Sequence, residues 1–236
     1  MISTNIGLLA VDSMRTRAYL SSLIENGIHL KEAILLENGS SKVPSSNNNT
    51  SLFDSESSAL EMLEKMRTNV TTLETSNIND QQVEKTLINS RIKLFIYSGS
   101  GGAIIKSNIL DTQKQFLHIH PGYLPDYRGS TTIYYSLLQD NSCGAAAILL
   151  DQNIDTGPIV SRKRFDPPAD WNTIDYEYDP YIRSQLLLEV ITEYIKNEKL
   201  PTSIEQNPEG YNYYIMHPLL RHLTILSQTM TFDTEA

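Results

Sequence analysis

The stretch FLHIHPGYLPDYRG, at residues 116–129, decides how the rest of the chain is interpreted. Its first residues are strand formers, and side chains alternate along a strand, so His118 and His120 should point to the same side. Pro121 cannot donate to a sheet ladder and restricts the residue before it, so the strand should end there. Both imidazoles are therefore expected at the carboxyl end of a strand, where ligands bind in open α/β sheets.

Composition places the chain among ordinary globular proteins. Of its 236 residues, 40% are hydrophobic and 20% are charged. The net charge is −9 with no dense run of Lys or Arg, which argues against a nucleic-acid partner. The single cysteine, Cys143, excludes an internal disulfide and predicts a reducing compartment. Residues 1–14 lack a basic region, and their apolar run is too short to span a bilayer, so we expect a cytoplasmic protein without membrane contact.

The opening of the chain predicts a βαβ unit. The continuous apolar run at residues 6–11 is typical of a strand buried on both faces. Asp12 and Ser13 can cap a helix over 15–25, and residues 30–37 form a second strand, which implies parallel pairing and a right-handed crossover.

The spacing of apolar residues and the positions of turn residues predict the remaining elements. Helices are expected at 59–66, 80–90, around 104–110, at 131–139 and at about 178–196, and strands at 70–73, 93–98, 145–150 and 159–165. The last of these strands should pair antiparallel with its predecessor, and the polar residues 38–51 should form a mobile surface loop.

Together these elements predict an α/β fold with a Rossmann-like, mostly parallel sheet, helices on both faces and a small C-terminal α+β extension. The expected domains are a catalytic domain at 1–165 and an extension at 166–236 packed on this core.

A carboxylate should join the two histidines. Asp155, in the turn after the strand at 145–150, is the preferred candidate, although Asp151 could also serve. A nearby carboxylate holds an imidazole charged, a charged imidazole stabilises an oxyanion, and a carboxylate can accept the proton of an attacking amine. These groups indicate acyl-type transfer without naming the acyl group. The alternative is a metal-dependent enzyme with His118, His120 and Asp155 as ligands.

Three motifs resemble the folate-dependent formyltransferases, a family that includes the glycinamide ribonucleotide, methionyl-tRNA and nucleotide-aminosugar enzymes. HPGYLPDYRG resembles the family signature HPSxLPxYRG, and IDTGPIV at residues 154–160 is similar to the family segment LDTGPI or LDGGPI. YSGSGGAII at residues 97–105 is similar to the strand and glycine-containing loop that line the folate pocket. The resemblance covers roughly residues 93–165.

The resemblance implies a role for each matching residue. His120 matches the catalytic histidine, which stabilises the oxyanion, and Asp155 matches the catalytic aspartate, which accepts the amine proton directly or through water. The implied co-substrate is N10-formyltetrahydrofolate, and no metal is required. The positions implied to contact it are Gly102, Ile104, Leu150, Asp151, Asn153 and Asp155.

One residue departs from the family pattern Asn-x-His-Pro, because His118 stands where the family has Asn. A neutral imidazole has one N–H donor and could replace the amide, but its size and donor direction differ. His118 therefore indicates a re-tuned enzyme, a different reaction, or a protein that binds folate or a nucleotide and turns over slowly.

The acceptor is expected to be a small amine. Residues 10–14 lack the glycines that hold the acceptor phosphate in the glycinamide ribonucleotide enzymes, and the tail at 166–236 is shorter and more acidic than a tRNA-binding domain. A nucleotide-linked aminosugar or another small metabolite amine remains. Arg15, Arg128 and Tyr127 are the candidate acceptor contacts. The tyrosines of the tail should pack on the core or form a subunit contact, and the second option would make a homodimer.

Overall fold

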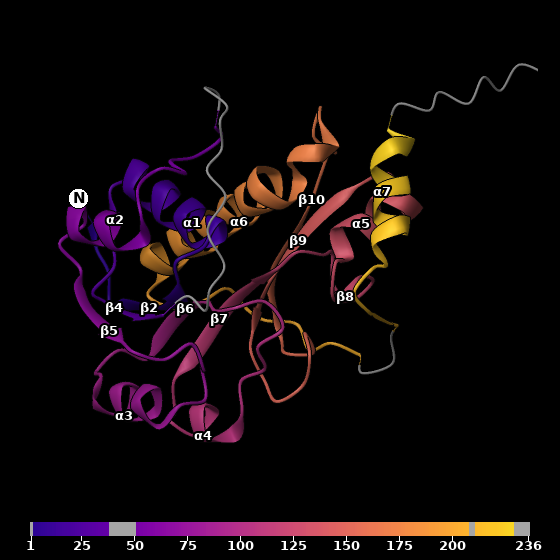
Figure 1. The fold of residues 1–236 in the computed structure, drawn as a ribbon. Helices are drawn as coiled ribbons and strands as arrows, with labels where there is room; N and C mark the ends of the chain where they lie inside the picture. The colour runs from indigo at the N-terminus through magenta and orange to yellow at the C-terminus, as the bar shows by residue number, and fades with distance from the viewer. Residues whose placement is uncertain (1, 38–50, 208–210, 229–236) are drawn as a thin grey trace, which may run out of the picture.

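The computed structural model describes residues 2–37, 51–207 and 211–228, and the sheet at its centre has the order β10-β9-β7-β6-β2-β4-β5 (Figure 1). The pairs from β7 through β5 are parallel, while β9 runs antiparallel to both β7 and β10. The strands of this sheet are β2 (Ile6–Val11), β4 (Glu32–Leu36), β5 (Asn69–Leu73), β6 (Leu94–Ser98), β7 (Gln115–His120), β9 (Cys143–Leu149) and β10 (Ile159–Phe165). The predicted α/β class with a mostly parallel sheet is confirmed.

Helices cover both faces of the sheet. Their bounds are α1 (Met14–Glu25), α2 (Ala59–Lys65), α3 (Gln81–Asn89), α4 (Ser107–Leu110), α5 (Thr132–Asp140), α6 (Asp179–Asn197) and α7 (Pro218–Ser227). Apolar side chains of α1, α2 and α6 form one core with the strands, and those of α3 and α4 form a second core on the opposite face. In Figure 1 the first group lies above the sheet and the second below it.

Local sequence explains where the first elements begin and end. All six residues of β2 are buried, as its uninterrupted apolar run predicts for a parallel strand. The Ser13 side chain accepts a hydrogen bond from the Thr16 backbone N–H and so caps α1. The helix ends at Glu25 with Asn26 as its C-cap, and Gly27 follows with a φ of 64°.

One expected element is shorter in the structure, and one strand has a direction that the sequence does not predict. The helix expected around 104–110 is reduced to the single turn of α4, and residues 99–106 form a loop. The strand β9 pairs antiparallel with β7, a direction that its apolar sequence does not encode. Residues 38–50 of the expected polar loop lie outside the described residues.

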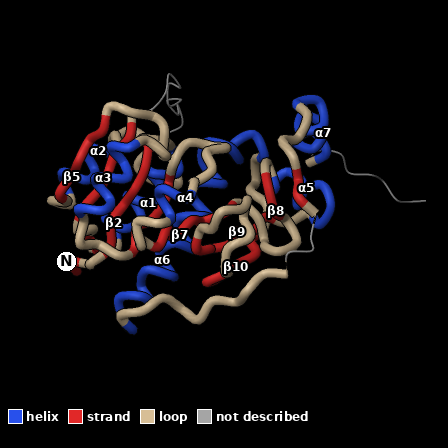
Figure 2. Tube along the Cα trace, turned by 90° about the horizontal axis from the view of Figure 1, so that it is seen from below, coloured by secondary structure: helices blue, strands red, loops and turns tan. Residues whose placement is uncertain are grey.

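The C-terminal residues contact the core at several places. A 3₁₀ turn (Trp171–Thr173) and a π turn (Ile174–Tyr178) lead into α6, which belongs to the same apolar core as α1. After α6 the chain passes beside β10 towards β8 (Arg128–Gly129), as the view from below shows (Figure 2). On this path Ile204 and Ile159 exchange two backbone hydrogen bonds, of 2.8 and 2.9 Å.

Short strand pairs complete the fold. β8 pairs in parallel with β11 (Asn212–Tyr213), and β1 (Ile2–Ser3) pairs in parallel with β3 (Ile28–His29). α7 packs against α5. The domain boundary expected after residue 165 stays a prediction. α6, which follows that position, contributes side chains to the main core.

Within the described ranges, we find no helix whose length and apolar character would allow it to cross a bilayer.

Candidate active site

The two histidines of β7 meet Asp155, as the sequence predicts. One ring nitrogen of each histidine and one carboxylate oxygen of Asp155 lie within 4.8 Å of one another. β7 is parallel to β6, and Tyr97 pairs with His118, so the group lies at the carboxyl end of these two strands. This edge is where open α/β sheets bind ligands.

His120 is fully engaged by its surroundings. It is 1% exposed. Its Nδ1 lies 3.3 Å from Asp155 Oδ2, and its Nε2 lies 2.7 Å from the backbone carbonyl oxygen of Tyr127. Both partners lie within reach of a ring nitrogen, one on each side of the imidazole. The surroundings of His120 therefore fix the orientation of its ring.

Asp155 reaches His120 through a loop that turns back. β9 leaves the sheet beside the amino end of β7, where the Leu150 N–H donates to the Phe116 carbonyl at 2.9 Å. The loop at 150–158 returns to the other end, and Asp155 adopts a left-handed backbone with a φ of 53°. The Gln206 side chain holds this conformation by donating to the carbonyls of Asp155 and Gly157, at 3.0 and 2.6 Å.

The carboxylate of Asp155 is strongly stabilised. Burial would raise its pKa, but the charge of His120 and the hydrogen bond from its ring outweigh burial and lower the pKa to about 2. The Gly129 N–H contributes a further bond at 3.2 Å. Gly129 has a φ of 107°, and a Cβ there would lie 2.2 Å from the Tyr213 carbonyl oxygen, so this position requires glycine.

His118 has different surroundings. Its side chain is only half-buried, and its Nδ1 lies 3.5 Å from the Tyr97 carbonyl oxygen, at the limit of a hydrogen bond. Burial of the ring, followed by the positive charges of Arg183 and Arg15, lowers the pKa of His118 well below its usual range. His118 is therefore a neutral imidazole and the more accessible of the two.

The segments expected to contact folate flank one apolar cluster. Ala103 and Leu150 both pack against the cluster that contains Phe116. Beside them Ile104 is 49% exposed and Ile154 is 51% exposed, so each segment presents an apolar side chain.

The polar candidates for folate contact are placed as follows. Gly102 is exposed, with a φ of 75° and open space where a Cβ would be. The Asp151 carboxylate accepts from the Asn153 N–H at 3.0 Å and from the Thr156 hydroxyl, so it stabilises the loop that carries Asp155. The Asn153 side chain is exposed. Contact of these residues with folate stays a prediction.

The three candidate acceptor contacts differ in placement. Arg15 donates to Ser98 Oγ at 2.9 Å, at the carboxyl end of β6, and therefore lies near the site. The Tyr127 side chain is 3% exposed and donates to Asp140 Oδ2 at 2.6 Å. The Arg128 side chain is 1% exposed and donates to Gln206 Oε1 at 3.1 Å. The placement of Tyr127 and Arg128 favours structural support of the site over contact with an acceptor.

Some residues support the site through contacts that are distant in the sequence, and no sequence pattern identifies them. Gln206 lies 51 positions from Asp155, and no local pattern links the two. The Tyr127 backbone carbonyl orients His120, a function that is independent of the side chain. Arg183 belongs to α6, whose helical pattern marks it only as one position of an amphipathic helix.

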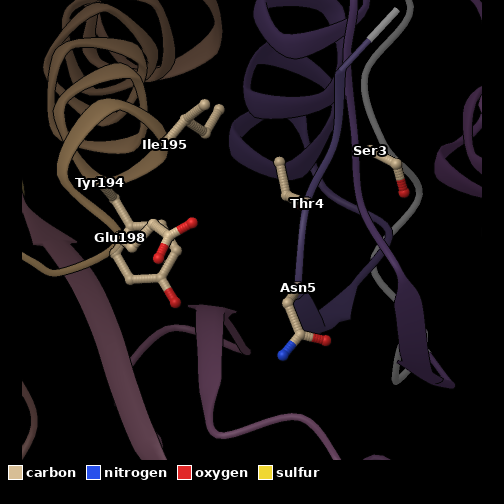
Figure 3. A pocket seen from close by; sticks show the side chains of 6 residues that line it. All are labelled: Ser3, Thr4, Asn5, Tyr194, Ile195 and Glu198. Carbon is tan, nitrogen blue, oxygen red and sulfur yellow. The ribbon is translucent and has the colours of Figure 1, made fainter.

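A pocket of about 360 Å³ lies elsewhere, lined by Ser3, Thr4, Asn5, Tyr194, Ile195 and Glu198 (Figure 3). Asn5 immediately precedes β2, so this pocket is at the amino edge of the parallel strands, opposite the histidines. It contains none of the groups that the sequence singles out.

Comparison with known proteins places these features in a family context. The sequence model of the family described as Formyl transferase matches residues 37–171. The methionyl-tRNA formyltransferase of Finegoldia magna is 39% identical over 87 residues, which are 36% of this chain and 28% of the relative. That of Chloroflexus aurantiacus (strain J-10-fl) is 25% identical over 158 residues, 66% of this chain and 49% of the relative. The chain thus spans less than half the length of these curated relatives.

Solved structures share the fold. An N-formyltransferase from Helicobacter canadensis, in complex with folinic acid and dTDP-3-aminofucose, aligns with a TM-score of 0.60 at 18% identity, over 91% of this chain and 71% of its own. A glycinamide ribonucleotide transformylase from Symbiobacterium toebii aligns with a TM-score of 0.60 at 15% identity, over 88% of this chain and 95% of its own.

Proposed function

Because the chain belongs to the formyl transferase family, we propose that it transfers the formyl group of N10-formyltetrahydrofolate to the amine of a small acceptor. The observation that supports this function best is the convergence of His118, His120 and Asp155 within 4.8 Å at the carboxyl edge of the sheet. The residues between and around them carry the family motifs, and no other cluster of the described residues combines these features.

The apolar surfaces beside the site suit the co-substrate. A pterin needs an apolar pocket with a few polar contacts. Ile104 and Ile154 offer half-exposed apolar side chains from the two segments that flank the site, and the loop at 150–155 offers backbone groups. Bound there, N10-formyltetrahydrofolate would supply the formyl carbon, which forms a bond to the acceptor nitrogen as its bond to N10 breaks.

His120 and Asp155 would act as one unit. Attack of an amine on a formyl carbon places negative charge on the formyl oxygen, and a preorganised positive charge stabilises that state. Asp155 and the Tyr127 carbonyl keep the His120 ring oriented, and as an imidazolium the ring would supply that charge. Both nitrogens of His120 are engaged, so its contribution would be the charge that it holds beside the reacting atoms.

His118 would accept the proton that the acceptor amine loses. A general base needs to be unprotonated and within reach of the reacting atoms. His118 is neutral, half-exposed and has one contact at the limit of a hydrogen bond, whereas the Asp155 carboxylate is already paired with His120. This assignment differs from the one implied by the family resemblance, in which the aspartate accepts the proton and position 118 only donates.

We propose a nucleotide-linked aminosugar as the acceptor. The supporting observation is the shared fold with the Helicobacter canadensis enzyme, whose complex contains dTDP-3-aminofucose. The competing acceptors are those named for the other relatives, glycinamide ribonucleotide and methionyl-tRNA.

A panel assay tests the function and the acceptor together. The purified protein is incubated with N10-formyltetrahydrofolate and each acceptor, namely a dTDP-aminosugar, glycinamide ribonucleotide or methionyl-tRNA, and formylated product is measured by mass spectrometry. We expect product with the aminosugar nucleotide. Product with glycinamide ribonucleotide or methionyl-tRNA alone would contradict the acceptor, and failure to bind folinic acid would contradict the function.

A metal-dependent enzyme is the second candidate, because the same three side chains are close enough to share a metal ion. Such an ion would have to displace Asp155 or the Tyr127 carbonyl from a nitrogen of His120, unless His120 stayed out of its coordination. Elemental analysis of the purified protein separates the two functions. A stoichiometric transition metal, removed by a chelator together with activity, would favour the metal enzyme.

A further inference from the structure

Two arginines from neighbouring helices lie near the histidines, one of them buried and the other partly exposed. Arg15 lies in the first turn of α1, and its guanidinium donates to Ser98 Oγ at 2.9 Å and to the Gly99 carbonyl. Arg183, in α6, is 4% exposed and donates from Nη1 to Asp179 Oδ2 at 3.1 Å. α1 and α6 pack against each other, so the pair lies where the two helices meet the carboxyl end of β6.

Both arginines lie within electrostatic range of the candidate active site. After burial, their charges are the largest contributions that lower the pKa of His118. After burial, the charge of Arg183 also lowers the pKa of Arg15, which falls to about 10. The geometry agrees, because Arg15 bonds to Ser98, next to the Tyr97 that pairs with His118, and α6 brings Arg183 against α1.

The positive charge of this pair is not balanced. Asp179 is the described carboxylate with the largest effect on both arginines, so two positive charges face one negative charge. The phenols of Tyr19 and Tyr97 lie in the same cluster, but burial raises the pKa of both, so they are neutral. Nε and Nη2 of Arg183 are buried, and the neutral Tyr19 hydroxyl is the further acceptor that interacts with this guanidinium.

The Arg183 guanidinium has five N–H donors, and one carboxylate oxygen with one neutral phenol leaves some of them without an acceptor. A buried charged group that lacks its hydrogen bonds destabilises the fold, and an excess of buried positive charge adds to this. The planar guanidinium matches the oxygens of phosphate and carboxylate groups, which supply both the missing acceptors and the missing negative charge. Arg15 is partly exposed and can be reached from solvent.

We propose that Arg15 and Arg183 bind a phosphoryl group of the acceptor. Arg15 would contact the phosphoryl oxygens directly, and the more deeply buried Arg183 would add positive charge behind it. A phosphoryl group offers three strong acceptor oxygens, which suits two guanidinium groups better than a carboxylate does. Asp179 Oδ1 also has no partner among the described residues and would accept from a hydroxyl of the same molecule. The assignment to the acceptor rests on the proposed function, whereas anion binding at this pair does not.

A titration with inorganic phosphate tests the site. The melting temperature of the full chain is followed as phosphate replaces chloride at constant ionic strength, for the wild type, Arg15→Gln and the control Arg91→Gln. Arg91 is an exposed arginine before β6, at the opposite end of the sheet. We expect a saturable rise in the wild type and in Arg91→Gln, and an affinity lower by about tenfold or more in Arg15→Gln, since hydrogen bonds to charged groups are lost. If Arg15→Gln does not fold, Arg15→Lys should still bind phosphate, with reduced affinity.

Three results would overturn the proposal. The first is that the wild type shows no saturable phosphate binding. The second is that the Arg15→Gln or Arg15→Lys variant binds phosphate as tightly as the wild type. The third is that the wild type binds acetate as tightly as phosphate, which would exclude a phosphoryl preference. Folinic acid binding is measured on the same samples. Binding of folinic acid without binding of phosphate would refute this site and leave the proposed function standing. Binding of phosphate without binding of folinic acid would support this site and contradict the proposed function.

Discussion

His118 and His120 lie two residues apart on the same face of one strand, yet their surroundings are opposite. His120 is 1% exposed, and both of its ring nitrogens have acceptor partners. His118 is half-buried, has one contact at the limit of a hydrogen bond, and lies near two arginines that lower its pKa. Asp155 explains much of this contrast, since its carboxylate is bonded to the first ring and only near the second. The neighbours of a histidine, more than its place on the strand, therefore determine whether it can hold a proton or accept one.

The largest effect is expected from His120→Asn. Loss of the imidazole removes the group proposed to stabilise the oxyanion and leaves Asp155 without its partner on β7. We expect the rate of formyl transfer to fall by about 10³-fold, as when a preorganised group that stabilises an oxyanion is removed. The rate is measured with saturating folate and acceptor, and thermal denaturation verifies the fold. His222→Asn, at an exposed histidine, is the matched control and should keep the wild-type rate. A wild-type rate in His120→Asn would contradict its role.

His118→Ala should have the next largest effect. If His118 accepts the amine proton, its removal should lower the rate by about 10²-fold. The fall in the wild-type rate at acid pH, where His118 becomes protonated, should be absent in the variant, and a pH–rate profile measures this. His118→Asn should be less impaired than His118→Ala if an amide at this position donates to the formyl oxygen. An unchanged acid limb in His118→Ala would assign proton transfer to another group.

A smaller effect is expected from Gln206→Ala. The side chain donates to two carbonyls of the loop that holds Asp155 in its left-handed conformation. Without these bonds the carboxylate should be less well positioned, and the rate should fall by about tenfold, since small misplacements of reacting groups reduce rates strongly. Gln82→Ala, an exposed glutamine of α3, is the control. Equal rates in the two variants would show that this bond does not position Asp155.

The smallest effect concerns stability at acid pH. The pKa of Asp155 is lowered from 3.8 to about 2 in the folded state, so its stabilisation is present above pH 4 and is lost as the pH falls towards 2. The linked free energy is on the order of 2 kcal/mol. Urea unfolding at pH 6, 4 and 3 should therefore show a steeper loss of stability for the wild type than for Asp155→Asn. Parallel curves would mean that Asp155 is not stabilised as a carboxylate in the folded protein.

The sequence was sufficient for the parts of the fold and site that depend on local patterns. Apolar runs predicted the strands, and the alternation of side chains placed His118 and His120 on one side. The motif around Asp155 predicted that it would join them. These features depend on neighbouring residues, and the structure has them where the sequence indicates.

Other features depend on contacts between distant residues. The run AAAILL in β9 is equally compatible with parallel and antiparallel pairing, so the direction of β9 and the return of the loop at 150–158 were not foreseen. Tyr127 and Arg128 are candidate acceptor contacts from the sequence, and the structure buries their side chains against Asp140 and Gln206. A motif identifies positions that matter without saying whether they bind a substrate or support a loop.

The dependence of His120 on Asp155 is the part of this account that one measurement tests most directly. Rates of formyl transfer are compared for the wild type, His120→Asn, Asp155→Asn and the variant with both changes. If the two side chains act as one unit, the double variant should be about as slow as the slower single variant, because residues that act together are strongly non-additive. If the losses multiply instead, the two groups act independently, and the buried pair at the end of β7 is not the catalytic unit.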